Sequence, residues 1–220
     1  MTIFEKNLSA LRRLHPEFLL PDDTTENTLE VVQAATGDPT AKSKGVFLHS
    51  KLDPRREARR FILQKAKGGC VVFFGFGLGY YVEEFLAVNR RGVAVVVEPD
   101  PALFRLALTV RDLTAVFESP GFNLVLDAEP DALTMVLNAF AHSTPIMAAP
   151  RSLVRLNEAY YQRLRAIIDS FISRREINNN TLNRFGRRWV RNLAANMPHL
   201  PAAHRLLSLE GTLQNTPALL

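Results

Sequence analysis

Three glycines at alternate positions, Gly75, Gly77 and Gly79, stand between an apolar run and a helical pattern. Glycines at such a junction let the backbone turn sharply and let a ligand approach more closely than any Cβ would allow. The helix expected to follow offers unpaired N–H groups and a partial positive charge at its N-terminus. Tyr80 stands where the dinucleotide fingerprint needs its third glycine, so the spacing is G-x-G-x-G, the form typical of S-adenosylmethionine-dependent methyltransferases. The loop therefore predicts a site for an adenosine moiety without a pyrophosphate.

Four other side chains are candidates to contact a ligand at this loop. Glu98 ends the next apolar run, where a carboxylate facing an open crevice accepts hydrogen bonds from ribose hydroxyls. Asp127 ends a third apolar run and is either an adenine contact or a helix-capping acid. His49 is either a ligand contact or base, or a histidine hydrogen-bonded within a hairpin. Tyr80 either stacks on a base or packs in the core.

The rest of the sequence adds no catalytic signature to these candidates. It contains no nucleophile elbow, P-loop or zinc pattern, and His199 and His204 have no third metal ligand at useful spacing. The catalytic residues are therefore unknown and no metal is expected. S-adenosylmethionine, a nucleotide and a nucleotide sugar all remain candidate ligands. In a further alternative, the glycines only permit tight strand–helix packing in an empty fold.

The elements that must position these residues alternate between strands and helices. Apolar runs begin at Cys70, Val93, Phe122 and Pro145, and helical patterns separate them. Continuous apolar runs are expected for strands that are covered on both faces, and this alternation makes right-handed crossovers and a parallel sheet. We therefore expect an α/β fold, with a Rossmann-like, methyltransferase-like parallel sheet flanked by helices over residues 54–150.

An N-terminal helix and β-hairpin element, residues 1–53, is expected before this sheet. Residues 4–20 have a helical period until His15-Pro16 interrupts it. The segments TLEVVQAA and GVFLHS are expected to form a hairpin with a loose loop over residues 36–45. A helix should then start at Asp53-Pro54, since an N-cap acceptor is followed by proline at the first helical position, and run over residues 54–66.

Residues 151–210 are expected to form a helical extension or linker made of a pair of long helices. The first runs over residues 151–176, and an asparagine-rich break at residues 177–180 ends it. Apolar residues at helical spacing mark the second helix: Leu182, Phe185, Trp189, Leu193 and Met197.

This C-terminal segment is strongly basic, whereas the rest of the chain is balanced. Residues 151–205 hold eleven arginines against three acidic residues, a net charge of +8, while residues 1–150 have a net charge of −2. Such asymmetry suits a polyanion partner or a solvated arginine face. The helical spacing marks Phe185 and Trp189 as core residues, which argues against a nucleic-acid surface. A hinge or a contact in a homo-oligomer is expected instead.

The composition bounds the class of protein. The 220 residues are 47% apolar and 22% charged, as in an ordinary globular protein, and the single cysteine, Cys70, excludes an internal disulfide. No stretch approaches the ~18 apolar residues of a membrane span, and Met1 to Leu20 has no signal-peptide cleavage pattern. We expect a soluble, cytoplasmic protein with no membrane partner.

Several segments resemble the N-terminal domain of the motility accessory factor (Maf) proteins. The resemblance covers nearly the whole chain, and the segments that carry it are FLHSKLDP over residues 47–54, Glu57-Ala58, GFGLGY over 75–80, Glu98-Pro99 and NTLNRFGRRWVRN over 180–192. It implies a bacterial glycosyltransferase that places nonulosonic acids, pseudaminic or legionaminic acid, on flagellin. In that family catalysis lies in a central domain that is related to 6-hydroxymethylpterin diphosphokinases and resembles sialyltransferases.

The resemblance implies that residues 211–220 begin this truncated following domain. It also implies that flagellin and the following domain are partners, and that residues 1–220 are a non-catalytic, nucleotide-binding-like domain without activity of their own. The alternatives are an S-adenosylmethionine-dependent methyltransferase and a scaffold with an empty Rossmann cleft. A methyltransferase should carry a polar catalytic motif after the fourth strand, but Met147 to Pro150 offers no acid–base group, which argues against methylation.

Overall fold

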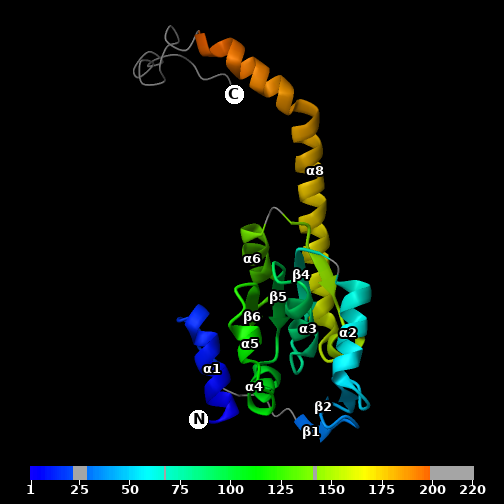
Figure 1. Ribbon diagram of the computed structural model, residues 1–220. Coiled ribbons are helices and arrows are strands. Elements are labelled where there is room, and N and C mark those ends of the chain that lie inside the picture. Colours follow the sequence, from blue (N-terminus) through cyan, green and yellow to red (C-terminus); the bar gives the residue numbers. More distant parts are fainter. Residues whose placement is uncertain (22–28, 67, 141–142, 199–220) are drawn as a thin grey trace, which may run out of the picture. The chain divides into compact units, whose positions relative to one another are not determined.

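The structure, a computed structural model, describes residues 1–21, 29–66, 68–140 and 143–198 (Figure 1). The chain divides into two compact units, residues 1–172 and residues 173–220. The last part of the predicted helical extension, residues 199–210, and the predicted start of a further domain at residues 211–220 lie outside the described residues.

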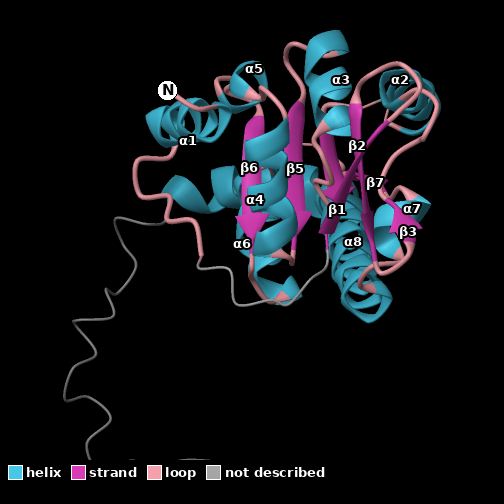
Figure 2. Cartoon of the chain, turned by 90° about the horizontal axis from the view of Figure 1, so that it is seen from below, coloured by secondary structure: helices cyan, strands magenta, loops and turns pink. Residues whose placement is uncertain are grey.

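A four-stranded parallel sheet forms the centre of the first unit (Figure 2). Its strands are β4 (Cys70–Phe74), β5 (Val93–Glu98), β6 (Phe122–Leu126) and β7 (Ile146–Ala148). They lie in the order β6-β5-β4-β7, and each neighbouring pair is parallel. The predicted α/β, Rossmann-like fold is therefore confirmed. The strand order reverses beside β4, where sheets of this kind form a crevice at their carboxyl edge.

Helices cover both faces of this sheet. Alternate residues such as Phe73 and Val96 pack against α1 (Ile3–Leu14), α2 (Pro54–Lys65), α3 (Tyr80–Val88), α4 (Pro101–Val110) and the short α5 (Thr114–Phe117). Their neighbours Phe74 and Val97 face the other side, where α6 (Leu133–Ala139) and the first turns of α8 (Glu158–Asn196) lie. A 3₁₀ turn, Pro130–Ala132, precedes α6. Burial on both faces explains the continuous apolar runs of the central strands.

The N-terminal element differs from the prediction in its loop. β1 (Leu29–Gln33), β2 (Pro39–Ser43) and β3 (Val46–Phe47) form a three-stranded antiparallel sheet, so the predicted loose loop over residues 36–45 contains its central strand. The alternation of apolar and polar residues did not indicate this strand, because its buried positions include polar residues. Thr40 is buried and its hydroxyl donates to the carbonyl of His49. The predicted helix start is confirmed, since the Asp53 carboxylate accepts from the Arg56 N–H at the start of α2.

The C-terminal helices also differ from the prediction. The break falls at residues 155–157, between α7 (Arg151–Val154) and α8, rather than at residues 177–180. Asparagine is only a moderately poor helix former, and neither glycine nor proline stands among residues 177–180 to stop the helix. The early turns of α8 pack into the first unit through the buried side chains of Tyr161, Leu164, Ile168 and Phe171.

The prediction that Phe185 and Trp189 are core residues is wrong for Trp189, whereas Phe185 is half-buried. Their rings stack on each other with centroids 6.2 Å apart, but Trp189 remains 51% exposed. Within the described ranges, no helix is both long and apolar enough to cross a membrane.

Candidate functional site

The glycine loop connects β4 to α3 in the predicted place. All three glycines have positive φ, +93° at Gly75, +56° at Gly77 and +82° at Gly79. The Gly75 N–H donates to the carbonyl of Val97, which ties the start of the loop to β5. The sharp turn expected from the spacing is therefore present.

Glu98 is almost fully buried, and backbone N–H groups engage both of its carboxylate oxygens. It is 2% exposed, and its two carboxylate oxygens accept from the N–H groups of Phe76, at 2.9 Å, and Asp100, at 3.0 Å. Burial raises the pKa of Glu98 to about 7, and these two N–H groups oppose the shift only in part. The side chain thus has a structural role that the sequence did not predict, because it ties the glycine loop to the start of α4.

The space in front of the glycine loop is filled by side chains of the protein itself. A Cβ on Gly75 would lie 3.1 Å from Leu153 Cβ and 3.1 Å from the Tyr161 hydroxyl. A Cβ on Gly77 would lie 2.7 Å from His49 Nε2 and 3.1 Å from Leu153 Cδ2. The glycines thus permit close packing of three side chains from the hairpin region, α7 and α8, in the place that a ligand would take.

His49 is hydrogen-bonded within the fold. Its Nε2 accepts from the Leu78 N–H at 2.9 Å, and its ring lies against those of Tyr80 and Tyr81. Burial, and then the charge of Arg111, lowers the pKa of His49 to about 3. The ring is therefore neutral at physiological pH, and the single lone pair that a neutral imidazole offers is taken by the backbone. These contacts support the hydrogen-bonded alternative over a catalytic base.

Tyr80 also packs rather than presenting its ring to a ligand. It is buried, and its hydroxyl donates to the Pro39 carbonyl at 2.7 Å. One side of the ring is covered by the Arg111 guanidinium, whose central carbon lies 3.6 Å from the ring centroid. Of the two roles predicted for this residue, the structure supports packing.

Arg111 is a second anchor of the loop, and the sequence analysis missed it. The side chain is 4% exposed, and it donates to the Leu78 carbonyl at 2.7 Å and to Glu83 at 2.5 Å. A lone arginine after an apolar helix carries no pattern that relates it to a loop 33 residues earlier. Only the tertiary fold brings Arg111, which follows α4, next to Leu78, which lies in the glycine loop before α3.

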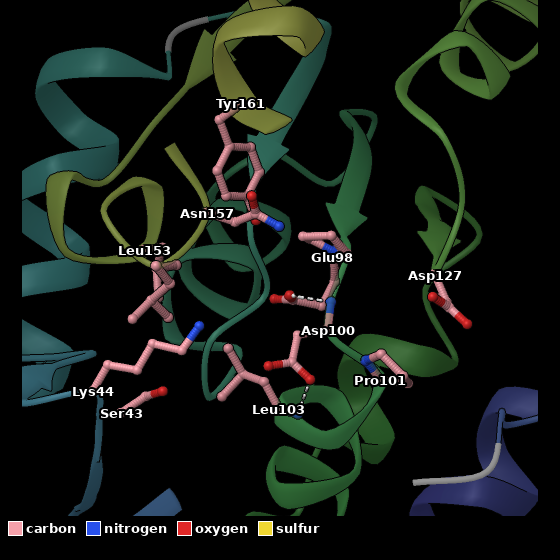
Figure 3. Close-up of a pocket in the computed structure, with 12 residues that line it drawn as sticks. Ser43, Lys44, Glu98, Asp100, Pro101, Leu103, Asp127, Leu153, Asn157 and Tyr161 are labelled. Carbon is pink, nitrogen blue, oxygen red and sulfur yellow. Dashed lines mark hydrogen bonds between the residues drawn. The ribbon is translucent and has the colours of Figure 1, made fainter. Parts of the chain in front are cut away.

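A cavity of about 270 Å³ lies beside the glycine loop, at the carboxyl edge of the sheet (Figure 3). Its polar lining comprises Ser43, Lys44, Glu98, Asp100, Asp127, Asn157 and Tyr161. Of the predicted site residues, Glu98 and Asp127 line it, whereas the three glycines, His49 and Tyr80 do not. Figure 3 shows Asp127 apart from the other side chains. Asp127 is exposed and has a φ of +47°, and its side chain does not cap the following 3₁₀ turn.

Glu98 and His49 should make opposite contributions to stability between pH 4.5 and 6.5. Over this range an unfolded glutamate loses its proton while the folded Glu98, with a pKa of about 7, keeps it, so the Glu98 contribution to stability falls as the pH rises. An unfolded histidine loses its proton as the pH rises through about 6.5, while the folded His49 is already neutral above pH 3. The His49 contribution therefore rises with pH, and the two contributions largely cancel.

Single variants should reveal these hidden contributions. We expect the unfolding free energy of Glu98→Gln to rise by about 2 to 3 kcal/mol from pH 4.5 to 6.5 relative to wild type, and that of His49→Gln to fall by a similar amount. Urea denaturation at pH 4.5, 5.5 and 6.5 measures both. Parallel pH profiles for the three proteins would contradict the opposed titration of these two groups.

Three comparisons show which known proteins this chain is similar to. A family model described as the glycosyltransferase Maf N-terminal domain matches residues 40–154, which is more than half of the chain. An uncharacterized protein of Treponema pallidum (strain Nichols) is 31% identical over 201 residues, which are 88% of this chain and 64% of that protein. The structure of a Maf glycosyltransferase from Magnetospirillum magneticum AMB-1 has 17% identity and a TM-score of 0.48, over 76% of this chain and 35% of that one.

The chain therefore spans less than two thirds of the Treponema protein and about a third of the Magnetospirillum protein. The family match includes β2 except for Pro39, the glycine loop, the whole parallel sheet and α7. Because this match extends over more than half of the residues, the chain belongs to the Maf glycosyltransferase N-terminal domain family.

Proposed function

We propose that this chain is the non-catalytic N-terminal domain of a Maf-type glycosyltransferase that transfers nonulosonic acids to flagellin. Membership of the family supports the glycosyltransferase. The sugar and the acceptor rest on the resemblance of the loop and helix motifs described above. The two relatives continue beyond the region they share with this chain, which leaves room there for a catalytic domain as the partner of this one.

The main support for a non-catalytic role is that side chains of the protein fill the space in front of the glycine loop. A Rossmann-like domain binds its ligand at the carboxyl edge of the sheet, against the glycine loop. Here His49, Leu153 and Tyr161 occupy that place. Two titratable groups beside it, Glu98 and His49, already accept hydrogen bonds from backbone N–H groups. The face of the glycine loop therefore offers no space for a ligand, and both Glu98 and His49 are held by the fold, which supports a scaffold role for the domain.

Ligand titration separates this proposal from the S-adenosylmethionine-dependent methyltransferase. We expect no saturable heat in isothermal titration, and no thermal shift, with S-adenosylmethionine, its demethylated product, a CMP-sugar or ATP at millimolar concentration. A ligand at 100 times its dissociation constant would stabilise the fold by about 2.7 kcal/mol, which a thermal shift detects readily. Binding of S-adenosylmethionine that weakens about tenfold or more in Glu98→Gln would overturn the scaffold and favour the methyltransferase.

A transfer assay tests the glycosyltransferase assignment directly. The 220-residue chain is incubated with unmodified flagellin and a CMP-activated nonulosonic acid, and the intact mass of flagellin is measured. We expect no added sugar mass with this chain and an added mass with the longer Magnetospirillum protein as the reference enzyme. Sugar transfer by the 220-residue chain alone would show that it is catalytic and would refute the proposed role.

A further inference from the structure

The cavity beside the glycine loop is bounded by four separate parts of the first unit (Figure 3). They are the turn between β2 and β3, the segment after β5, the end of β6 and the segment that joins α7 to α8. Its volume of about 270 Å³ is close to the ~300 Å³ of the smallest typical ligand pockets, which suits a molecule of about one sugar ring. Sheets of this kind bind ligands at this edge. The cavity therefore has the place and the size of a small-molecule site.

Two buried hydroxyl groups on the wall of the cavity lack a good partner within the protein. Ser43 is 4% exposed, and within the described ranges no residue forms a hydrogen bond with its hydroxyl. Tyr161 is 3% exposed, and its hydroxyl lies 3.5 Å from the Val97 carbonyl, well beyond the ~2.7 Å of a good O–H···O bond. Buried polar groups in folded proteins are mostly hydrogen-bonded. A polar ligand in the cavity would give both hydroxyls a partner.

The two non-glycine residues with a positive φ in the described part of the chain both line this cavity. They are Lys44, at +50°, and Asp127, at +47°, and backbone strain of this kind gathers at functional sites. Lys44 and Gly45 form the two-residue turn between β2 and β3, where asparagine followed by glycine is the preferred pair. No ion pair with a described residue engages the Lys44 ammonium, and Figure 3 shows it directed toward the cavity. A contact with a ligand gives a reason for lysine at this position.

The charges of the lining select against an anionic ligand. Besides the Lys44 ammonium, the cavity presents the carboxyl groups of Glu98, Asp100 and Asp127, so that a phosphate or a carboxylate would meet like charges. A hydroxyl group both donates and accepts, and it can therefore bond to carboxyl, ammonium and amide groups alike. The rest of the wall is apolar and includes Leu103, Leu153 and Leu156. An uncharged ring that carries hydroxyl groups matches both kinds of wall.

We propose that this cavity binds one uncharged sugar ring. The Lys44 ammonium donates to one ring hydroxyl, and the hydroxyls of Ser43 and Tyr161 bond to others. The Asn157 amide, which Figure 3 shows turned toward Glu98, both donates and accepts at the same ring. This site goes beyond the scaffold role, because a domain without catalytic groups can still hold a sugar. The sugar is either free or a residue of a glycan, since both carry the same neighbouring hydroxyls.

Saturation-transfer difference NMR with the 220-residue chain tests the site. The probes are ribose, glucose and N-acetylglucosamine at millimolar concentration, together with the methyl glycosides of the last two. We expect saturation transfer from the protein to at least one of these rings. Binding of a free sugar but not of its methyl glycoside identifies a free sugar as the ligand, whereas binding of both identifies a site that accepts a residue of a glycan.

Two substitutions should weaken this binding without unfolding the protein. Lys44→Asn removes the ammonium and should raise the dissociation constant of the bound sugar about tenfold or more, while Ser43→Ala should raise it about two- to tenfold. Lys44→Asn should also unfold at an equal or higher urea concentration than wild type, because asparagine adopts the left-handed conformation more readily. The matched control is Lys42→Asn, which removes a lysine of β2 that does not line the cavity and should leave the affinity unchanged.

Three results would overturn the proposal. They are the absence of saturation transfer to every probe, sugar binding that Ser43→Ala and Lys44→Asn leave unchanged, and an equal loss of affinity in Lys42→Asn. Binding of acetate or inorganic phosphate without binding of any sugar would identify an anion site instead. None of these results bears on the non-catalytic role, which the transfer assay and the S-adenosylmethionine titration test separately.

Discussion

Gly77→Ala is expected to lower the free energy of unfolding by about 2 to 5 kcal/mol, a large part of the ~5 to 15 kcal/mol of a typical domain. Two costs add. A φ of +56° costs a residue with a Cβ about 1 to 2 kcal/mol. The new methyl group would also stand 2.7 Å from His49 Nε2 and 3.1 Å from Leu153, so it must displace the imidazole and leave the buried Leu78 N–H without its acceptor, at about 1 to 3 kcal/mol. Urea denaturation measures the loss.

Gly45→Ala is the matched control for this prediction. Gly45 has a φ of +79°, but no described atom lies within 4 Å of the place its Cβ would take. Its substitution should therefore cost only the backbone strain, about 1 kcal/mol once the lower entropy of the unfolded chain is counted. Equal losses for the two variants would show that the space before Gly77 is open, and would restore the case for a ligand there.

Arg111→Ala is expected to destabilise the fold by about 3 to 5 kcal/mol, because this buried side chain has three partners. It removes a charged donor from the buried Leu78 carbonyl, at about 1.5 to 3 kcal/mol. It also removes a cation stacked 3.6 Å over the Tyr80 ring, worth about 1 to 2 kcal/mol when desolvated, and the ion pair with Glu83. The fold then lacks the contacts that hold Leu78 and α3 in place, and urea denaturation measures the difference.

Arg55→Ala is the control for Arg111→Ala. Arg55 pairs with the same Glu83 oxygen at 3.4 Å and lies near the same Tyr80 ring, but its side chain is 58% exposed. Exposed ion pairs contribute about 0 to 1 kcal/mol, so this variant should change the unfolding free energy by less than about 1 kcal/mol. Similar effects of the two substitutions would show that the pairing with Glu83, rather than the buried contacts of Arg111, stabilises the loop.

The Gly77→Ala and Arg111→Ala predictions bear on the proposed function because both concern the glycine loop. In this loop the backbone N–H and the backbone carbonyl of Leu78 are each held by a side chain of the protein. His49 accepts from the N–H of Leu78 and Arg111 donates to its carbonyl. A loop fixed in this way by its own fold suits a scaffold. A ligand-binding loop would instead keep such groups available for the ligand.

The sequence alone determined the elements of the sheet and the place of the glycine loop. The runs Val71 to Phe74 and Val95 to Val97 are apolar at every position, as expected for strands covered on both faces. Asp53-Pro54 marked the start of α2 because capping is a local interaction between residues three apart. The family resemblance followed from the same local motifs, and the match over residues 40–154 confirms it.

The helix pattern after residue 150 was less informative. Spacing at three and four indicates a helix but does not distinguish a buried stripe from an exposed one, so the buried Phe171 and the exposed Trp189 looked alike. Local pattern also suggested a break at the asparagines, whereas the structure turns at residues 155–157, where α7 ends over the glycine loop.

Only the tertiary structure decided what the candidate site contains. Glu98 ends its strand as predicted, yet two backbone N–H groups occupy its carboxylate. His49 and Leu153, which lie 26 residues before and 78 residues after Gly75 in the sequence, meet in front of the same loop. Whether a glycine loop is open depends on side chains brought there by distant elements, and no spacing within the motif records them. The sequence thus determined the loop, and long-range packing determined that it is filled.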